Sequence, residues 1–316
     1  MDALSIFKEQ IGDRLLPIII KYDPYLDKFQ THPYFHVQDI DFENKFVDII
    51  FDNILFYAFE KDEIEKEYQN GNFSNLKRLA RVAYQRRIPK TERPNDGLLG
   101  ELTLDAFLKV FYPNIEMLYA RAKYLEKIPH IEKNPTITGQ EIKGYDGMVF
   151  SVEGGQKYFW VGQVKTGTWE YCLNSIKKDI NKGIIKYYFS DSILIMCDIM
   201  RAVSSSSKEL RKIIDTINEI DFNYIDREEK TNKIIEYFNN ENIIVRMPCL
   251  IIPNESNYLN EEKLLEIVKI KIKESFKNFE IENKEKLKIE IYLLVFPLRD
   301  LKKVRDLFLE ARENGD

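Results

Sequence analysis

Residues 144–165 read GYDGMVFSVEGGQKYFWVGQVK, and this stretch decides the fold of the chain. Two runs rich in apolar and β-branched residues flank Gly154-Gly155, and a glycine pair of this kind favours a tight hairpin turn. The pattern predicts one strand over residues 147–152 and a returning strand that runs through Lys165. Because side chains alternate between the two faces of a strand, Gln163 and Lys165 should share one face.

The predicted hairpin brings three polar side chains together. Asp146 begins the first strand, and Gln163 and Lys165 end the second, so the three should lie close in space. A carboxylate suits a hard cation such as Mg²⁺, and a lysine can stabilise charge that develops on a phosphate. This combination indicates metal-dependent hydrolysis of a phosphodiester. The structural alternative is an ordinary turn aspartate and a lysine that extends from a strand end.

Composition limits the classes of function. The 316 residues carry a formal net charge of -5, with a pI of about 5.6, so no global positive field attracts nucleic acid. Any contact with DNA must come from a local patch. The three cysteines have no metal-ligand spacing and are odd in number, which favours buried thiols in a reducing compartment. Because neither a signal peptide nor a long apolar run is present, we expect a cytoplasmic protein that does not contact membranes.

The densest basic cluster lies on a helix that apolar spacing predicts from residue 76 onward. Its members are Lys77, Arg78, Arg81, Arg86 and Arg87. This face is either a DNA phosphate contact or an ordinary solvated helix surface. Proximity to the predicted hairpin would favour the first interpretation.

A second helix is predicted over residues 98–112, directly upstream of the hairpin. Glu101 and Asp105 are four residues apart and should share a face of this helix. Glu101 follows Gly100 in an apolar setting, so it is the candidate for a second carboxylate at the metal site. An exposed helical glutamate is the alternative.

Apolar periodicity predicts further elements along the chain. Helices are expected at residues 42–59, 169–180, 210–220, 233–238, 264–276 and 301–308, and strands at 192–197, 243–252 and 287–296. Pro248 should confine its strand to a sheet edge or a bulge. Residues 4–40 read as irregular, with His32 and His36 in a loop. The order predicts an α/β fold with a mixed sheet flanked by helices.

Two organisations of the chain fit this reading. In the first, residues 1–74 form an N-terminal helical and irregular region that packs on a domain of residues 75–316, whose C-terminal part is an α/β extension. In the second, the whole chain forms one integrated domain.

Glu101, Asp146, Gln163 and Lys165, in this order on helix, strand and strand, resemble the PD-(D/E)xK nuclease superfamily in its Gln-x-Lys variant. More narrowly, Gly100-Glu101-Leu102, Arg121-Ala122-Lys123 and Gly144-Tyr145-Asp146-Gly147 resemble the HamA family, the nuclease subunits of the Hachiman antiphage system.

The resemblance implies a restriction-endonuclease-like mixed sheet and a DNA nuclease that depends on Mg²⁺ or Mn²⁺ and has low sequence specificity. It also implies that Asp146, Glu101 and Gln163 hold the metal. A partner helicase of superfamily 2 (HamB-like) would keep this nuclease repressed until it is released. The departure is Gln163, where many relatives should have a glutamate, and a neutral side chain there should weaken metal affinity.

Two alternatives stay open. The chain could be a catalytically silent subunit that binds DNA or the helicase and keeps the nuclease fold. It could also be a nuclease gated by a cyclic nucleotide, although no ligand-sensing domain is evident after residue 200. Degradation of plasmid DNA by the purified chain would separate the first alternative from an active nuclease.

Overall fold

The computed structural model describes residues 1–88, 97–112, 115–116, 147–183, 189–194, 197, 208–258 and 260–313. Within these residues an eight-stranded mixed sheet has the order β1-β3-β8-β7-β6-β5-β4, and β2 pairs with β3. The strands are β1 Ile19–Lys21, β2 Tyr25–Leu26, β3 Gln30–His36, β4 Ile115–Glu116, β5 Gly147–Glu153, β6 Gln156–Gly167, β7 Ile244–Pro253 and β8 Ile289–Val295. β3, β8, β7 and β6 are parallel to one another, and β5 and β4 continue the sheet in antiparallel pairing.

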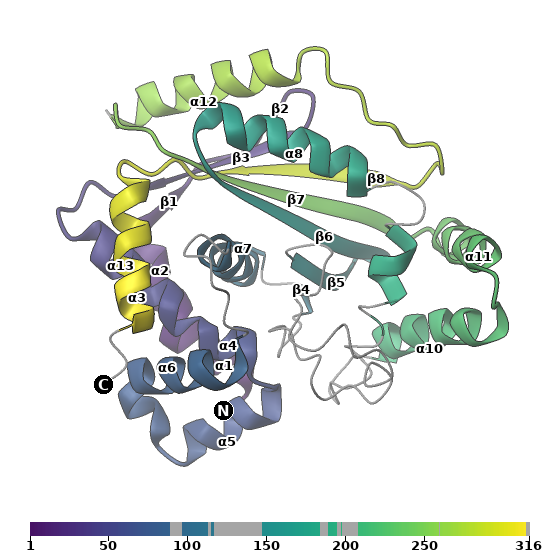
Figure 1. The fold of residues 1–316 in the computed structure, drawn as a ribbon, viewed down its shortest axis with the longest axis horizontal. Helices are drawn as coiled ribbons and strands as arrows, with labels where there is room; N and C mark the ends of the chain where they lie inside the picture. The colour runs from purple at the N-terminus through teal and green to yellow at the C-terminus, as the bar shows by residue number, and fades with distance from the viewer. Residues whose placement is uncertain are drawn as a thin grey trace.

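Helices cover both faces of this sheet (Figure 1). They are α1 Ala3–Phe7, α2 Asp13–Leu15, α3 Phe42–Asp52, α4 Ile54–Ala58, α5 Lys61–Gln69, α6 Leu76–Arg87, α7 Leu98–Phe111, α8 Trp169–Gly183, α10 Lys208–Asn223, α11 Arg227–Asn240, α12 Glu261–Phe276 and α13 Leu301–Glu313. Short turns add a π-helix η1 Lys8–Gly12 and the 3-10 helices η2 Leu16–Ile18 and η3 Asn72–Asn75. The predicted class, a restriction-endonuclease-like mixed sheet flanked by helices with N-terminal helical additions, is confirmed.

The predicted β5–β6 hairpin is confirmed. The two strands pair in antiparallel register from Gly147 opposite Gly162 to Glu153 opposite Gln156. Gly154 and Gly155, the two turn residues, have φ angles of 56° and 83°. Positive φ at both central positions is the mark of a type I′ turn, which glycine adopts without steric cost. The turn therefore fixes the register of the strand that carries Gln163 and Lys165.

Each face of β6 belongs to a different hydrophobic core. Trp160 and Val164 pack with α3, α4, α7 and α13 in one core. Phe159 and Val161 pack with α8, α10, α11 and α12 in the other. Strand alternation therefore assigns Gln163 and Lys165 to the face that α8 covers. The first core contains residues from both predicted parts of the chain, and a boundary near residue 74 stays a prediction.

The prediction of an irregular N-terminal segment with loop histidines was wrong. Residues 30–36 form β3, which pairs in parallel with β8 from the far end of the chain. His32 and His36 lie on this strand and are 4% and 2% exposed. The partner strand is more than 250 residues away, so local periodicity contained no signal for it.

Residues 192–197 were predicted as a strand, but 189–194 and 197 are helical. The buried hydrophobic side chains of this segment are Phe189, Ile193 and Cys197, which are four residues apart, a helical spacing. A short apolar run does not distinguish a buried strand from a buried helix.

Two further predictions needed correction. Pro248 lies in the central strand β7, not at an edge or bulge. Val161 and Gly162 of β6 have no paired residue in β7, yet the pairs on either side, Trp160 with Arg246 and Gln163 with Cys249, keep the same register. The predicted helix over residues 42–59 is divided at Asn53 into α3 and α4.

Candidate functional site

Gln163 and Lys165 lie in the second half of β6, opposite Cys249 and Ile251 of β7. Gln163 is buried, whereas the Lys165 side chain is 23% exposed. The structure thus brings these two predicted site residues together on one face. β7 pairs with the backbone at both residues, whereas the described pairing of β6 with β5 ends at Gly162, one residue before Gln163.

Helix α8 returns the chain along this face of the strand. The Thr168 hydroxyl accepts a hydrogen bond from the Tyr171 backbone N–H at 3.2 Å and so caps the start of the helix. Cys172 lies against the strand, with its Sγ 3.4 Å from the Lys165 carbonyl oxygen, and burial raises the pKa of its thiol to about 12. The Lys165 Nζ lies 2.7 Å from an Oδ2 atom of Asp179, further along α8.

Glu101 lies on the opposite face of β6. Helix α7 approaches the strand so closely at Gly100 that an added Cβ would lie 3.0 Å from Val164 Cγ2. Glu101 is 7% exposed, and its Oε2 accepts a 2.6 Å hydrogen bond from the Tyr57 hydroxyl of α4. The described structure therefore does not bring Glu101 to Gln163 and Lys165.

The polar face of α7 is buried rather than solvated. Asp105 forms a 2.8 Å ion pair with Lys109 and accepts a 3.0 Å hydrogen bond from the Asn53 side chain at the α3–α4 break. Because unpaired buried charges are costly, this pairing explains how an acidic stripe can face the helical layer. Glu101 and Asp105 share a face, as predicted, and that face packs on α4 and Asn53.

Asp146, the carboxylate that the hairpin was expected to supply, lies outside the described residues. The first described residue of β5 is Gly147, opposite Gly162, the residue before Gln163. Among the described residues no group of three His, Cys, Asp or Glu side chains is placed to hold a metal ion.

The predicted basic face lies away from this part of β6. Helix α6 packs on α3 and α4, on the outer side of the helical layer (Figure 1). Lys77 forms a 2.9 Å ion pair with Asp48, and both side chains are largely exposed. Arg86 and Arg87 end the helix, and their side chains lie outside the description. Any phosphate that this face contacts is therefore distant from the Lys165 face.

Helix α13 forms hydrogen bonds with the end of β6. Arg305 donates hydrogen bonds from Nη2 to the Thr166 carbonyl at 3.0 Å and to the Thr166 hydroxyl at 2.7 Å. Because side chains alternate along a strand, the Thr166 side chain lies on the face of β6 opposite Lys165, and Arg305 approaches the strand from that face. They fix the backbone one residue beyond Lys165.

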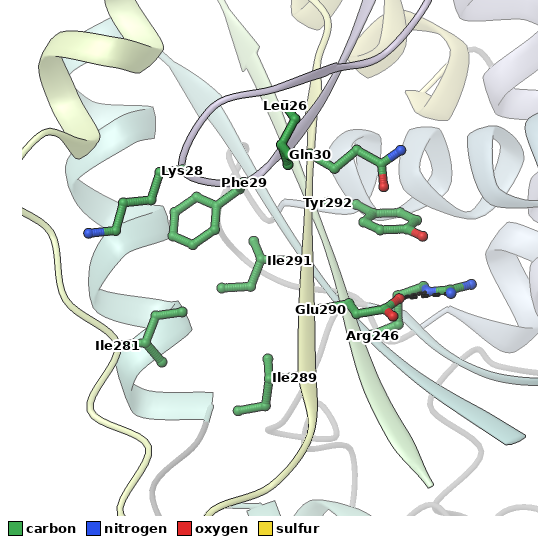
Figure 2. Close-up of a pocket in the computed structure, with 10 residues that line it drawn as sticks. All are labelled: Leu26, Lys28, Phe29, Gln30, Arg246, Ile281, Ile289, Glu290, Ile291 and Tyr292. Atoms are coloured by element: carbon green, nitrogen blue, oxygen red, sulfur yellow. Dashed lines mark hydrogen bonds and ion pairs between the residues drawn. The ribbon is translucent and has the colours of Figure 1, made fainter. Parts of the chain in front are cut away.

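A hollow of about 440 Å³ lies at the other end of the parallel strands (Figure 2). Figure 2 shows Arg246 beside Glu290 and Tyr292 on one side of β8, with Ile289 and Ile291 on the other. The Arg246 guanidinium pairs with Glu290 at 2.8 Å and with Glu153 at 3.0 Å, and its carbon lies 3.7 Å from the centre of the Tyr158 ring. The positive charge of Arg246 is thus paired with two carboxylates. The hollow lies at the opposite end of the strands and adds no catalytic group to the Lys165 site.

Sequence reasoning missed Tyr57 and Asp179, which contact the predicted site residues Glu101 and Lys165 in the described structure. Asp179 lies between Ile176 and Ile180, two residues of the buried stripe of α8. A charged residue next to such a stripe lies at the edge of the packed face, and this position was the signal that could have identified it. Tyr57 lies among apolar residues of the helix predicted over residues 42–59, and nothing local to it indicated a carboxylate partner.

The mixed sheet flanked by helices is a fold of the restriction-endonuclease-like class. The sequence model of the HamA family matches residues 17–311 of the 316. The chain therefore belongs to the HamA family, which makes it a component of Hachiman antiviral defence. No curated protein and no solved structure matches the chain. None of the helices that the structure describes is long and apolar enough to span a membrane.

Proposed function

We propose that this chain is the DNA nuclease of its defence system, a Mg²⁺- or Mn²⁺-dependent phosphodiester hydrolase with low sequence specificity. One observation carries the proposal. Gln163 and Lys165 lie side by side on one face of an interior strand, directly after a hairpin whose first described residue follows Asp146. Membership of the HamA family supports it.

The chemistry assigns a role to each residue. The Asp146 carboxylate and the Gln163 amide oxygen would hold the metal ion, which supplies an activated water and polarises the phosphate. Lys165 would stabilise the charge that develops on the phosphate oxygens. Tyr57 holds Glu101 on the other face of β6. Glu101 would therefore contribute less to catalysis than Asp146 and would act only through water.

A nuclease that reads no sequence would also attack the DNA of its host, so its activity needs control. We propose that a partner helicase of superfamily 2 restrains the chain and releases it after sensing foreign or damaged DNA. The second candidate, a silent subunit that binds DNA or the helicase, is favoured only by the neutral side chain at position 163, which should lower metal affinity.

Plasmid cleavage by the purified chain tests the nuclease. Wild type should degrade plasmid DNA with Mg²⁺ or Mn²⁺, and EDTA should stop the reaction. Asp146→Ala and Lys165→Ala should each lower the rate by about 10²–10³ at least, as expected when a group that stabilises transition-state charge is lost. Unchanged thermal unfolding would show that each variant is folded. Full activity in either variant would remove this site, and an inert wild type, alone and with the helicase, would favour the silent subunit.

Co-expression with the helicase tests the control. The purified complex should cut intact DNA more slowly than the free chain, and cleavage should return when the helicase hydrolyses ATP on DNA. Failure of the two proteins to copurify would reject this part of the proposal and leave the nuclease assignment standing.

A further inference from the structure

The face of β6 that carries Gln163 and Lys165 has a carboxylate that no motif in the sequence supplied. Asp179 Oδ2 lies 2.7 Å from Lys165 Nζ, and the two side chains are 24% and 23% exposed. The pair is thus partly withdrawn from solvent, where opposite charges attract more strongly than on an open surface.

The contact is built by a strand, a turn and a helix that follow one another in the chain. β6 ends at Gly167, Thr168 caps α8, and α8 packs back over the strand, with Cys172 against the Lys165 carbonyl. Asp179 is fourteen residues after Lys165 and flanks the buried Ile176 and Ile180, so packing of this stripe fixes where its carboxylate can reach.

Charge explains why this carboxylate matters. Position 163 is a neutral glutamine, and the Glu101 carboxylate is bound to Tyr57 on the opposite face. Asp179 is an acidic side chain that the described structure places against Lys165, on the face that α8 covers. A lysine has a long flexible stem, and an anionic partner restricts the positions of its ammonium group.

We propose that Asp179 is a positioning residue of the nuclease and holds the Lys165 ammonium group where it meets the charge of the scissile phosphate. This inference rests on the proposed function. It differs from a plain ion pair that joins α8 to β6, because such a pair would affect folding and leave turnover unchanged.

Three single variants test the assignment in the full-length chain. Asp179→Asn keeps the shape and removes the charge, Asp179→Glu keeps the charge, and Glu170→Gln removes an exposed charge from the first turn of the same helix. For each variant we would measure kcat and KM for plasmid cleavage with Mg²⁺, DNA affinity with Ca²⁺ in place of Mg²⁺, and thermal unfolding.

Asp179→Asn should lower kcat by about 10- to 100-fold, the usual loss when a partner that orients a catalytic group is removed. Its KM, DNA affinity and unfolding temperature should stay at the wild-type values. Asp179→Glu should recover most of the lost kcat, and Glu170→Gln should behave as wild type.

Other results would overturn the inference. Wild-type kcat in Asp179→Asn, or equal losses in Asp179→Asn and Asp179→Glu together with a lower unfolding temperature, would leave Asp179 a structural residue only. The nuclease proposal would survive either result. Absence of metal-dependent cleavage by the wild-type chain would instead reject both.

Discussion

Tyr57 donates a 2.6 Å hydrogen bond to Glu101, and this bond holds the Glu101 carboxylate on the face of β6 opposite Lys165. Both side chains are buried, Tyr57 almost completely. A residue that sequence order places in the nuclease motif thus has a contact within the helical layer of α4 and α7. Its contributions to folding and to cleavage can be separated by experiment.

We expect Tyr57→Phe to lower the free energy of unfolding by about 1–3 kcal/mol, because the buried Glu101 carboxylate loses one hydrogen-bond donor. Cleavage should be affected much less than in Lys165→Ala. The control is Tyr68→Phe, which removes a similar bond of 2.9 Å to Glu9 at the exposed surface and should cost little. Denaturant unfolding and plasmid cleavage check both variants. A loss of cleavage in Tyr57→Phe as large as in Lys165→Ala would give Glu101 a central part in catalysis.

The basic face of α6 gives a second prediction. If Lys77, Arg78 and Arg81 contact DNA phosphates, their joint replacement by glutamine should reduce the slope of log affinity against log salt by about 0.9 for each lost contact. Stability should change little, since the Lys77–Asp48 pair is largely exposed. The control replaces three exposed lysines of α12, Lys263, Lys271 and Lys273. Equal slopes for the two triple variants would assign the α6 face to solubility or to a protein partner.

Gly100 sets the distance between α7 and β6. A Cβ at this position would lie 3.0 and 3.2 Å from methyl carbons of Val164 and Thr166. Gly100→Ala should therefore destabilise the fold by about 1–3 kcal/mol, although alanine favours a helix. In the control, Gly12→Ala, the nearest atom is at 3.8 Å, so that variant should be neutral or slightly stabilising. Thermal or denaturant unfolding compares the two, and equal stabilities would mean that α7 shifts at no cost.

His32 makes stability depend on pH. Burial, with a smaller effect of Lys21, lowers the pKa of His32 from 6.5 to about 4. The unfolded chain therefore binds more protons than the folded chain between these values, so stability is full above pH 6.5 and is lost as the pH falls toward 4. His36, whose pKa is lowered mainly by burial, acts in the same direction.

We expect His32 to account for a loss of about 1 kcal/mol between pH 7.5 and 5.5. In His32→Gln that part of the pH dependence should disappear, while any loss of stability that does not vary with pH reflects packing. Denaturant titrations of both proteins at the two pH values provide the measurement. The same pH slope in wild type and variant would contradict the assignment to His32.

The sequence by itself determined the elements whose signals are local. Gly154-Gly155 can take positive φ at both turn positions, so the hairpin and its register follow from that pair and the flanking strands. Alternation within β6 then put Gln163 and Lys165 on one face, because the side-chain period of a strand is a property of the backbone. The 3.6-residue period gave α7, α8 and α12 in the same way.

Tertiary structure decided the features that depend on partners far along the chain. β3 exists as a strand because it pairs with β8, and residues 189–194 are a helix because Phe189 and Ile193 are buried with α10 and α11. The contacts of Glu101 with Tyr57 and of Lys165 with Asp179 likewise come from the packing of separate elements. Local backbone preferences differ by less than the free energy of burying a side chain or pairing a charge, so contacts between distant segments choose among the conformations that the sequence allows.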